Sequence, residues 1–331
     1  MIKKPYLLFL GDAPDQLSAK VAVGIQHWRP DDCVGQLRLD DCHADTGLKD
    51  YGLEEAKDLG AKTLVVGVAN RGGIISDTWL THLEKALHLG YDIAAGLHNR
   101  LNDVPILAAA AESTGQQLFD VRHPTTTFPI ATGKKRSGKR LLPVGTDCSC
   151  GKMYTALAFE KELHQRGVAA DFRATGQTGI LVAGSGVSVD AVVADFIAGA
   201  VETLAPEGKD DHWDIVEGQG SLFHPSFAGV SLGLLHGAQP DALVLCHEPT
   251  RTHLRGLPHY PIPDITRCME ANLSAAQLTN PDARFVGACV NTSAMDQSAG
   301  SDFLQTLSDR IGLPAVDPVR DGVAAIVDYM L

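Results

Sequence analysis

Residues 141–154, LLPVGTDCSCGKMY, decide the fold of the second half of this chain. The apolar start predicts a strand, a turn with glycines at both ends follows, and a helical pattern begins at Lys152. In a strand–turn–helix unit of this kind, the turn amides and the helix N-terminus can point at one anion. We therefore predict a phosphate-binding loop made of Gly145, Thr146, Asp147, Cys148, Ser149, Cys150, Gly151, Lys152 and Met153.

The spacing of this loop differs from the common signature, because five residues separate Gly145 from the Gly151-Lys152 pair where four are usual. The longer form resembles the loop of dethiobiotin synthetase and related P-loop enzymes. Met153 stands where P-loop NTPases carry the Ser or Thr that binds Mg²⁺. A thioether is a poor ligand for a hard cation. The sequence therefore favours a loop that holds a phosphorylated cofactor over one that transfers a phosphoryl group.

Short apolar runs alternate with helical patterns along the whole chain, which predicts an α/β protein with mostly parallel sheets. The predicted strands are Tyr6–Leu10, Val34–Leu39, Thr63–Gly67, Asp92–Ala95, Gln117–Val121, Leu141–Val144, Ala170–Ala174, Trp213–Glu217, Ala242–Cys246 and Arg284–Val290. The predicted helices are Leu17–His27, Asp77–Leu89, Val104–Thr114, Lys152–Gln165, Val189–Leu204, Asp264–Leu278 and Asp302–Ile311.

The strongest boundary signal lies between residues 123 and 140, where prolines and glycines surround a basic run. We predict a Rossmann-like N-terminal domain over residues 1–125, a basic linker over 126–139, and a P-loop NTPase-like α/β domain of the dethiobiotin synthetase type over 140–331. The first turn, Gly11-Asp12-Ala13-Pro14, lacks the G-x-G-x-x-G spacing, so we predict no dinucleotide site there.

The composition of the chain limits the classes of partner that we expect it to bind. The chain has 331 residues and a formal net charge of −12, which disfavours nucleic acid and anionic membranes as partners. It contains no apolar run long enough to span a bilayer. Seven scattered cysteines do not form a disulfide framework. We expect a cytoplasmic protein that binds small molecules, and the sequence leaves open a homo-oligomer.

A longer set of segments resembles one family of two-domain proteins. They are GTDCSCGKMYTALAFEKEL (145–163), ATGQTGI (174–180), VDAVVADFIAGA (189–200), VEGQGSL (216–222), VNTS (290–293) and, more weakly, GVANRGG (67–73), GLH (96–98) and DVR (120–122). Characterised members of that family are D-glutamate N-acetyltransferases. The resemblance implies transfer of an acetyl group from acetyl-CoA, as co-substrate, to D-glutamate or a close D-amino acid. It implies that the loop anchors CoA phosphates and that no metal is required.

Acyl transfer to an amino acid needs a base for the ammonium and cations for the carboxylates. Residues 246–255, CHEPTRTHLR, follow a predicted strand and supply His247 or Glu248 as the base. Arg251 and Arg255 would share one face if this stretch were helical, and we expect them, with Arg71 from the first domain, to bind the substrate.

Three further polar features bear on the site. Glu217 ends a predicted strand before Gly218 and Gly220, resembles the acid that faces the phosphates in the synthetase group, and is a further catalytic candidate. Thr175 follows another strand and can line the same cleft. A basic run that immediately precedes the loop strand can contact the 3′-phosphate of CoA; its residues are Lys134, Lys135, Arg136, Lys139 and Arg140.

Several alternatives remain open at this point. The helix N-terminus is expected to lower the pKa of Cys148, which makes a covalent acetyl-cysteine route conceivable beside direct transfer. No histidine or cysteine spacing indicates a metal site. The competing functions are an ATP-dependent ligase or kinase of the dethiobiotin synthetase type, and a non-catalytic nucleotide-binding sensor.

Overall fold

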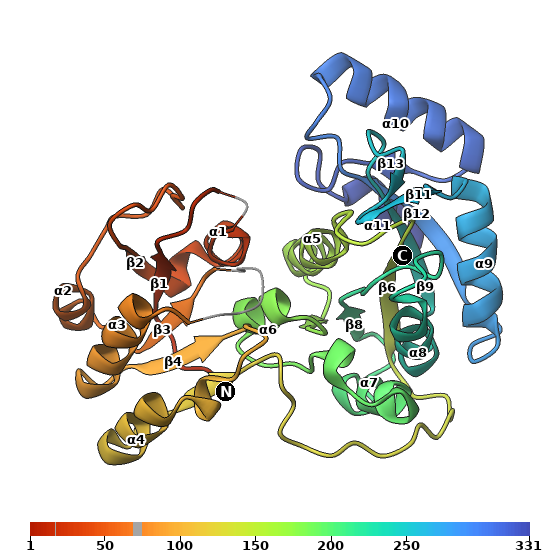
Figure 1. Ribbon diagram of the computed structural model, residues 1–331. Coiled ribbons are helices and arrows are strands. Elements are labelled where there is room, and N and C mark those ends of the chain that lie inside the picture. Colours follow the sequence, from red (N-terminus) through yellow and green to blue (C-terminus); the bar gives the residue numbers. More distant parts are fainter. Residues whose placement is uncertain (17, 69–74) are drawn as a thin grey trace. The chain divides into compact units, whose positions relative to one another are not determined.

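The computed structural model describes residues 1–16, 18–68 and 75–331. The described chain divides into two compact units, each an α/β layer structure (Figure 1). Unit 1 contains residues 1–125 together with 176–191, and unit 2 contains residues 126–175 and 192–331. Residues 176–191 belong to unit 1 because they contain helix α6 (Gln177–Ala183), which packs against helix α1 (Lys20–Trp28).

Unit 1 is a parallel five-stranded sheet in the order β2-β1-β3-β4-β5. Its strands are β1 (Tyr6–Gly11), β2 (Cys33–Arg38), β3 (Thr63–Val66), β4 (Asp92–Ala95) and β5 (Leu118–Asp120). Its other helices are α2 (Leu53–Asp58), α3 (Asp77–His88) and α4 (Pro105–Thr114). Helix α3 begins where the Ser76 side chain accepts a hydrogen bond from the Trp79 amide. Helix α4 begins with a proline and ends at Gly115 in the left-handed region. The Rossmann-like prediction for this half is confirmed.

Unit 2 is a parallel six-stranded sheet in the order β13-β12-β9-β6-β8-β7. Its strands are β6 (Lys139–Gly145), β7 (Ala170–Arg173), β8 (Trp213–Val216), β9 (Ala242–His247), β12 (Arg284–Val290) and β13 (Ala315–Val316). A small antiparallel hairpin, β10 (His253–Leu254) and β11 (Leu257–Pro261), follows β9. The P-loop-type α/β prediction for this half is confirmed.

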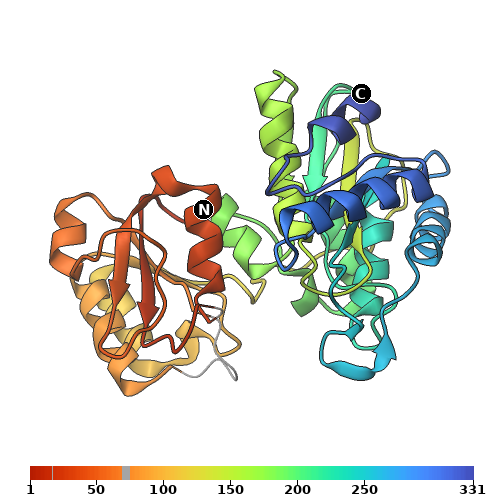
Figure 2. The ribbon, with the colours of Figure 1, turned by 90° about the horizontal axis from the view of Figure 1, so that it is seen from above.

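Helices cover both faces of the second sheet, which Figure 2 shows from above. Helices α5 (Lys152–Gln165) and α11 (Ala324–Met330) pack on one face, and α7 (Ile197–Leu204), α8 (Ala228–Ala238) and α9 (Ile265–Gln277) pack on the other. Helix α10 (Gln297–Ile311) packs against the edge strand β13. Strand β6 is central, with β9 and β8 as neighbours, so the carboxyl ends of these three strands meet at one edge.

Every predicted strand is present, but one helix prediction is wrong. Residues 189–204 do not form one helix: Val189–Ala191 and Ala194–Phe196 are 3₁₀ turns, and α7 begins at Ile197. Val193 adopts an extended backbone between the two turns, and two adjacent β-branched valines disfavour a helix at this point.

Helix α8 was not predicted, because three glycines interrupt its apolar pattern. Two of them, Gly233 and Gly237, allow close packing against α7. A Cβ atom on Gly237 would lie 2.4 Å from the Ala198 carbonyl oxygen, and one on Gly233 would lie 2.8 Å from Ile197 Cγ2. Within the described part of the chain, no helix has the length and apolar character needed to cross a membrane.

Candidate functional site

The loop between β6 and α5 wraps tightly around the lysine that begins the helix. Ser149 and Gly151 adopt left-handed backbone conformations, with φ of +51° and +103°, which bring Lys152 back over the loop. Lys152 Nζ lies 2.7 Å from the Asp147 carbonyl oxygen. A Cβ atom on Gly145 would lie 3.0 Å from the same Nζ, so only glycine fits there without displacing the lysine. The predicted strand–loop–helix unit is therefore present.

The Lys152 ammonium is a buried positive charge without an acidic partner in the described residues. The side chain is 6% exposed, and its other contact is Cys150 Sγ at 3.5 Å. A buried charge is costly unless an opposite charge meets it. Together with the N-terminus of α5, this lysine makes the loop a site that favours an anion.

The Arg251 side chain donates hydrogen bonds to several residues of the loop. Its Nη1 donates to Asp147 Oδ2 at 2.8 Å and to the Cys148 carbonyl at 2.6 Å, and its Nη2 donates to the Ser149 carbonyl at 2.8 Å. Its Nε lies 2.9 Å from Glu248 Oε2. All three nitrogens of this guanidinium therefore have protein partners, and its contacts are with the loop.

The segment after β9 is not helical, so Arg251 and Arg255 do not share a helix face. The backbone of this segment also contacts the loop, because the Arg255 amide donates a hydrogen bond to Asp147 Oδ2 at 2.9 Å. The Arg255 side chain is exposed and makes no hydrogen bond or ion pair with any described residue. Of the two arginines, Arg255 is the one available to bind a ligand.

His247 lies at the end of β9, level with the start of the loop, because Gly145 and Cys246 are paired in the sheet. Its Nδ1 is 3.0 Å from Thr146 Oγ1, and its ring stacks on Phe303 with centroids 6.0 Å apart. Burial lowers the pKa of His247, with the nearby Arg251 acting in the same direction and Glu248 opposing it. The imidazole is therefore neutral at neutral pH.

The two glutamates predicted as catalytic candidates are held by the protein. Glu217 is 4% exposed and its Oε2 accepts the Thr175 amide at 2.8 Å, so it joins the ends of β8 and β7. Glu248 accepts the amide and hydroxyl of Thr250 with Oε1, while Oε2 pairs with Arg251. Thr175 does lie at the same sheet edge as Glu217, as the sequence predicts.

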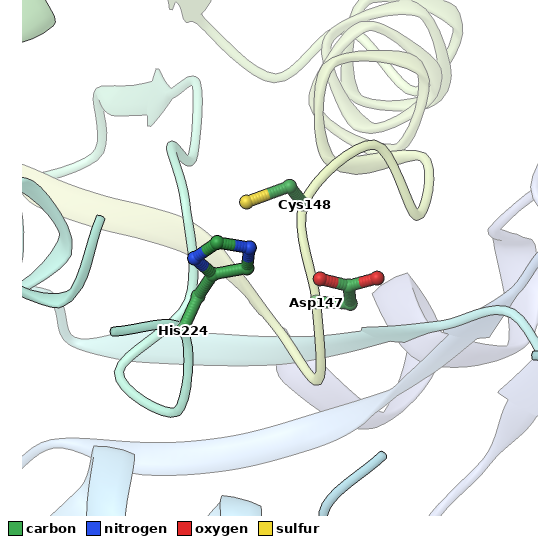
Figure 3. Close-up of side chains that lie close together, drawn as sticks. All are labelled: Asp147, Cys148 and His224. Carbon is green, nitrogen blue, oxygen red and sulfur yellow. The ribbon is translucent and has the colours of Figure 1, made fainter. Parts of the chain in front are cut away.

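Asp147, Cys148 and His224 form a polar cluster in which one potential ligand atom from each lies within 4.8 Å of the others (Figure 3). His224 follows β8 in the segment SLFHPSF, and sequence reasoning did not single it out. Its Nδ1 accepts the Ser226 amide at 3.3 Å, and its Nε2 lies 3.2 Å from the Arg255 carbonyl. These partners leave neither ring nitrogen with a free lone pair. Burial raises the pKa of Cys148 to about 11, so this thiol is protonated at neutral pH. In this arrangement, the cluster is not preformed for a metal ion.

The expected lowering of the Cys148 pKa is therefore wrong, because burial outweighs the nearby Lys152. A second polar cluster, Asp171, His212 and Asp214, has the spacing of a metal site as well. Arg173 occupies it, with Nε 2.6 Å from Asp214 and Nη2 3.0 Å from Asp171. We assign it as an ion-pair network.

Two residues of the predicted basic run, Arg136 and Arg140, lie far from the loop. Arg136 and Arg140 are buried beside the amino-terminal end of β6, and Arg136 donates to the carbonyls of Gly237 and Ala238 at the end of α8. The loop begins at the other end of this seven-residue strand, about 20 Å away. The expected contact of these two arginines with a loop-bound CoA is therefore not supported. Arg71 lies outside the described residues.

Comparisons with known proteins cover both halves of the chain. A family model described as a domain of unknown function, DUF1611_N, Rossmann-like domain, matches residues 34–124, and a second, DUF1611_C, P-loop domain, matches residues 129–327. The chain is 58% identical to a D-glutamate N-acetyltransferase of Tritonibacter scottomollicae, covering 100% of this chain and 99% of that protein.

A second curated relative, a D-glutamate N-acetyltransferase from a Pseudoalteromonas species, is 52% identical and covers 98% of both chains. Among solved structures, a DUF1611 family protein from Anabaena variabilis is similar, with a TM-score of 0.87, 31% identity and 99% of both chains covered. The similarity therefore extends over both units and includes the loop.

Proposed function

The chain belongs to the DUF1611 family, in which a Rossmann-like domain precedes a P-loop domain, and we propose that it transfers an acetyl group from acetyl-CoA to the amino group of D-glutamate. The full-length identity to two named N-acetyltransferases makes the chain an acyltransferase enzyme. The donor, the amino-acid acceptor and the role of the loop are the parts that this proposal adds.

The observation that carries the proposed role of the loop is the Lys152 ammonium. It is buried, and its contacts are a carbonyl oxygen and a thiol sulfur. The pyrophosphate of CoA supplies the missing negative charge, and loop amides provide further donors. Acyl transfer needs no metal, which agrees with Met153 at the position of the Mg²⁺-binding hydroxyl.

Anchoring at the pyrophosphate separates the loop from the reacting thioester. About 13 covalent bonds join the pyrophosphate to the sulfur of CoA, and a chain of that length spans at most about 15 Å. When the arm is extended, the transferred acetyl group lies well away from the loop. The base then cannot be a side chain that contacts the loop, unless the arm folds back.

The acceptor amino acid brings two carboxylates, which need cationic or hydrogen-bonding partners. Arg255 supplies one such partner in unit 2, since its side chain is exposed and makes no ion pair among the described residues. Of the three predicted catalytic candidates, Glu217 and Glu248 are engaged in protein contacts. His247 alone keeps a ring nitrogen, Nε2, without a partner in the described chain.

The test uses the purified full-length protein with acetyl-CoA and D-glutamate, following thiol release and formation of the N-acetyl product. L-Glutamate and D-aspartate are the comparison acceptors. ATP with Mg²⁺ is offered separately, and ADP release that depends on an acceptor would favour the ligase alternative instead. We expect metal-independent thiol release with D-glutamate, and no thiol release with any acceptor would refute the proposal.

The role of the loop has a separate test. Lys152→Ala removes one charge-assisted contact, so the KM for acetyl-CoA should rise on the order of 10- to 100-fold. Acetyl-pantetheine lacks the pyrophosphate, and with this donor the substitution should have little further effect. Lys161→Ala, on the exposed side of α5, is the matched control. An equal loss with both donors would place Lys152 in a different role.

A further inference from the structure

The hydrogen bond between Thr146 and His247 has a direction that the surroundings determine. Both residues are buried, at 1% and 7% exposure, and Thr146 Oγ1 is 3.0 Å from His247 Nδ1. Among the described residues, this ring nitrogen is the one acceptor within hydrogen-bond distance of the hydroxyl. If Nδ1 carried the proton instead, the buried hydroxyl proton would have no acceptor, at the cost of a lost hydrogen bond.

The direction of that bond fixes the tautomer of the ring. A neutral imidazole that accepts at Nδ1 carries its single proton on Nε2. Burial lowers the pKa of His247, so the neutral form is the one present at neutral pH. The stack on Phe303, with an interplanar angle of 22°, restrains the ring orientation. Nε2–H is therefore a fixed donor, and a nitrogen in this state cannot take a proton from the substrate ammonium.

The position of His247 indicates which acceptor this donor serves. Thr146 is the second residue of the loop, and Gly145, the first, is paired with Cys246, so His247 lies beside the anion-binding loop. The thioester of an extended donor lies up to about 15 Å from there. We infer that Thr146 holds His247 in the Nε2–H form, and that His247 donates to a phosphate oxygen of the acyl donor instead of serving as the general base.

This inference rests on the proposed binding of acetyl-CoA in the loop, but its first test does not require activity. Nitrogen-15 NMR of the histidines in the free protein reports which ring nitrogen carries the proton. We expect the Nε2–H form for His247 in the wild type and in Thr146→Ser. Thr146→Val keeps the shape but removes the hydroxyl, so the signal should shift towards a mixture of tautomers. Thr155→Val, a buried threonine on α5 that contacts Cys246, is the control. A wild-type Nδ1–H signal would overturn the inference.

The second test separates a phosphate contact from a role at the thioester. Calorimetry with CoA should show about 10- to 150-fold weaker binding for His247→Ala, the value expected for one hydrogen bond to a charged phosphate oxygen. His247→Gln, whose amide can donate from a similar position, should recover part of the loss. With acetyl-pantetheine, His247→Ala should react like the wild type.

Three results would contradict the inference or its premise in distinguishable ways. A kcat loss in His247→Ala that persists with acetyl-pantetheine, at unchanged KM, would assign His247 to the base or to the oxyanion. Unchanged CoA affinity in His247→Ala would refute the contact between His247 and a phosphate oxygen, but not the proposed binding of CoA in the loop. If the wild type itself does not bind CoA, the proposed role of the loop fails, whatever the NMR result.

Discussion

The Arg251 guanidinium lies against the loop between β6 and α5, with Nη1 2.8 Å from Asp147 Oδ2. The same group donates hydrogen bonds to the carbonyl oxygens of Cys148 and Ser149, and so fixes the orientation of the two peptides that contain them. In a trans peptide the N–H points opposite to the C=O. The amides of Ser149 and Cys150 are thereby turned away from Arg251. Arg251 therefore sets the orientation of the loop peptides and contributes a positive charge beside them.

The first prediction is that Arg251→Ala acts on the donor and not on the acceptor. Loss of the guanidinium frees two carbonyls and leaves the buried Asp147 carboxylate without its cation. We expect a rise in KM for acetyl-CoA of about tenfold or more, with KM for D-glutamate changed far less. Steady-state kinetics with each substrate varied in turn measures both. Arg251→Lys keeps the charge but not the fork of donors, and should recover only part of the loss.

The second prediction concerns the neighbouring arginine, Arg255, and distinguishes its role from that of Arg251. The Arg255 side chain is exposed and makes no ion pair with described residues, so its removal should leave the loop intact. We expect Arg255→Ala to raise KM for D-glutamate by roughly tenfold and to leave thermal stability unchanged, because one carboxylate contact is lost. A series of monocarboxylate acceptors should show a smaller difference between variant and wild type. A rise in KM for acetyl-CoA alone would assign Arg255 to the donor.

These two arginines show how far the sequence predicts this site. Strand β9 is readable from its short continuous apolar run, which the polar residues from His247 onwards end, and the loop is readable from its glycines and lysine. The sequence also places His247 and Glu217 after strands, at the edge where sites of parallel sheets open. It cannot show that Arg251 turns towards Asp147, because the two residues are 104 positions apart and meet only through the pairing of β6 with β9.

Tertiary packing accounts for the remaining differences between the predictions from sequence and the structure. Three glycines interrupt the apolar pattern of helix α8, so the sequence does not predict this helix, and two of them, Gly233 and Gly237, allow the close approach of α7. The arginines of the basic run look solvated in the sequence, yet Arg140 is fully buried against backbone carbonyls. His224 carries no motif and contacts the site only through the fold of the segment after β8. In each case a tertiary contact, and not a local pattern, decides the position.

The third prediction concerns Met153. The hydroxyl that binds Mg²⁺ in P-loop NTPases is missing at this position, and acyl transfer does not need it. Met153→Thr should therefore leave kcat and KM for acetyl transfer within about twofold of the wild type, with or without EDTA. Isothermal titration with ATP, at several Mg²⁺ concentrations, provides the comparison. A wild type that hydrolyses ATP in the presence of an acceptor would contradict the reasoning.

The fourth prediction is a pH dependence of stability that originates at His247. Burial lowers its pKa in the folded state, whereas the unfolded chain titrates near the ordinary value of about 6.5. Below that pH the unfolded chain binds the proton more readily. The contribution to folding is therefore present above about pH 6.5 and is lost as the pH falls through the lower, folded-state pKa.

Denaturant unfolding between pH 5 and 8 measures this effect. The stability of His247→Gln should fall less towards pH 5 than that of the wild type, and the two curves should run parallel above pH 7. His259→Gln, on the exposed strand β11, controls for the removal of a histidine. Curves that stay parallel down to pH 5 would show that His247 is already protonated, or equally accessible, in the folded protein.

The last prediction tests the close approach of the segment that follows β8, at Gly218, to strand β6. A Cβ atom on Gly218 would lie 1.8 Å from the Pro143 carbonyl oxygen and 3.0 Å from Lys152 Cδ. The first neighbour is backbone of the central strand β6 and cannot move aside cheaply. Gly218→Ala should therefore cost about 1–3 kcal/mol of stability, as overpacking does, and should also raise KM for acetyl-CoA through Lys152. Gly229→Ala, in α8, is the matched control, because its Cβ would meet nothing within 4 Å and should stabilise the helix by about 0.5–1 kcal/mol. Chemical denaturation of both variants gives the comparison, and a Gly218→Ala protein as stable as the wild type would show that Gly218 does not pack against the backbone of β6 as described.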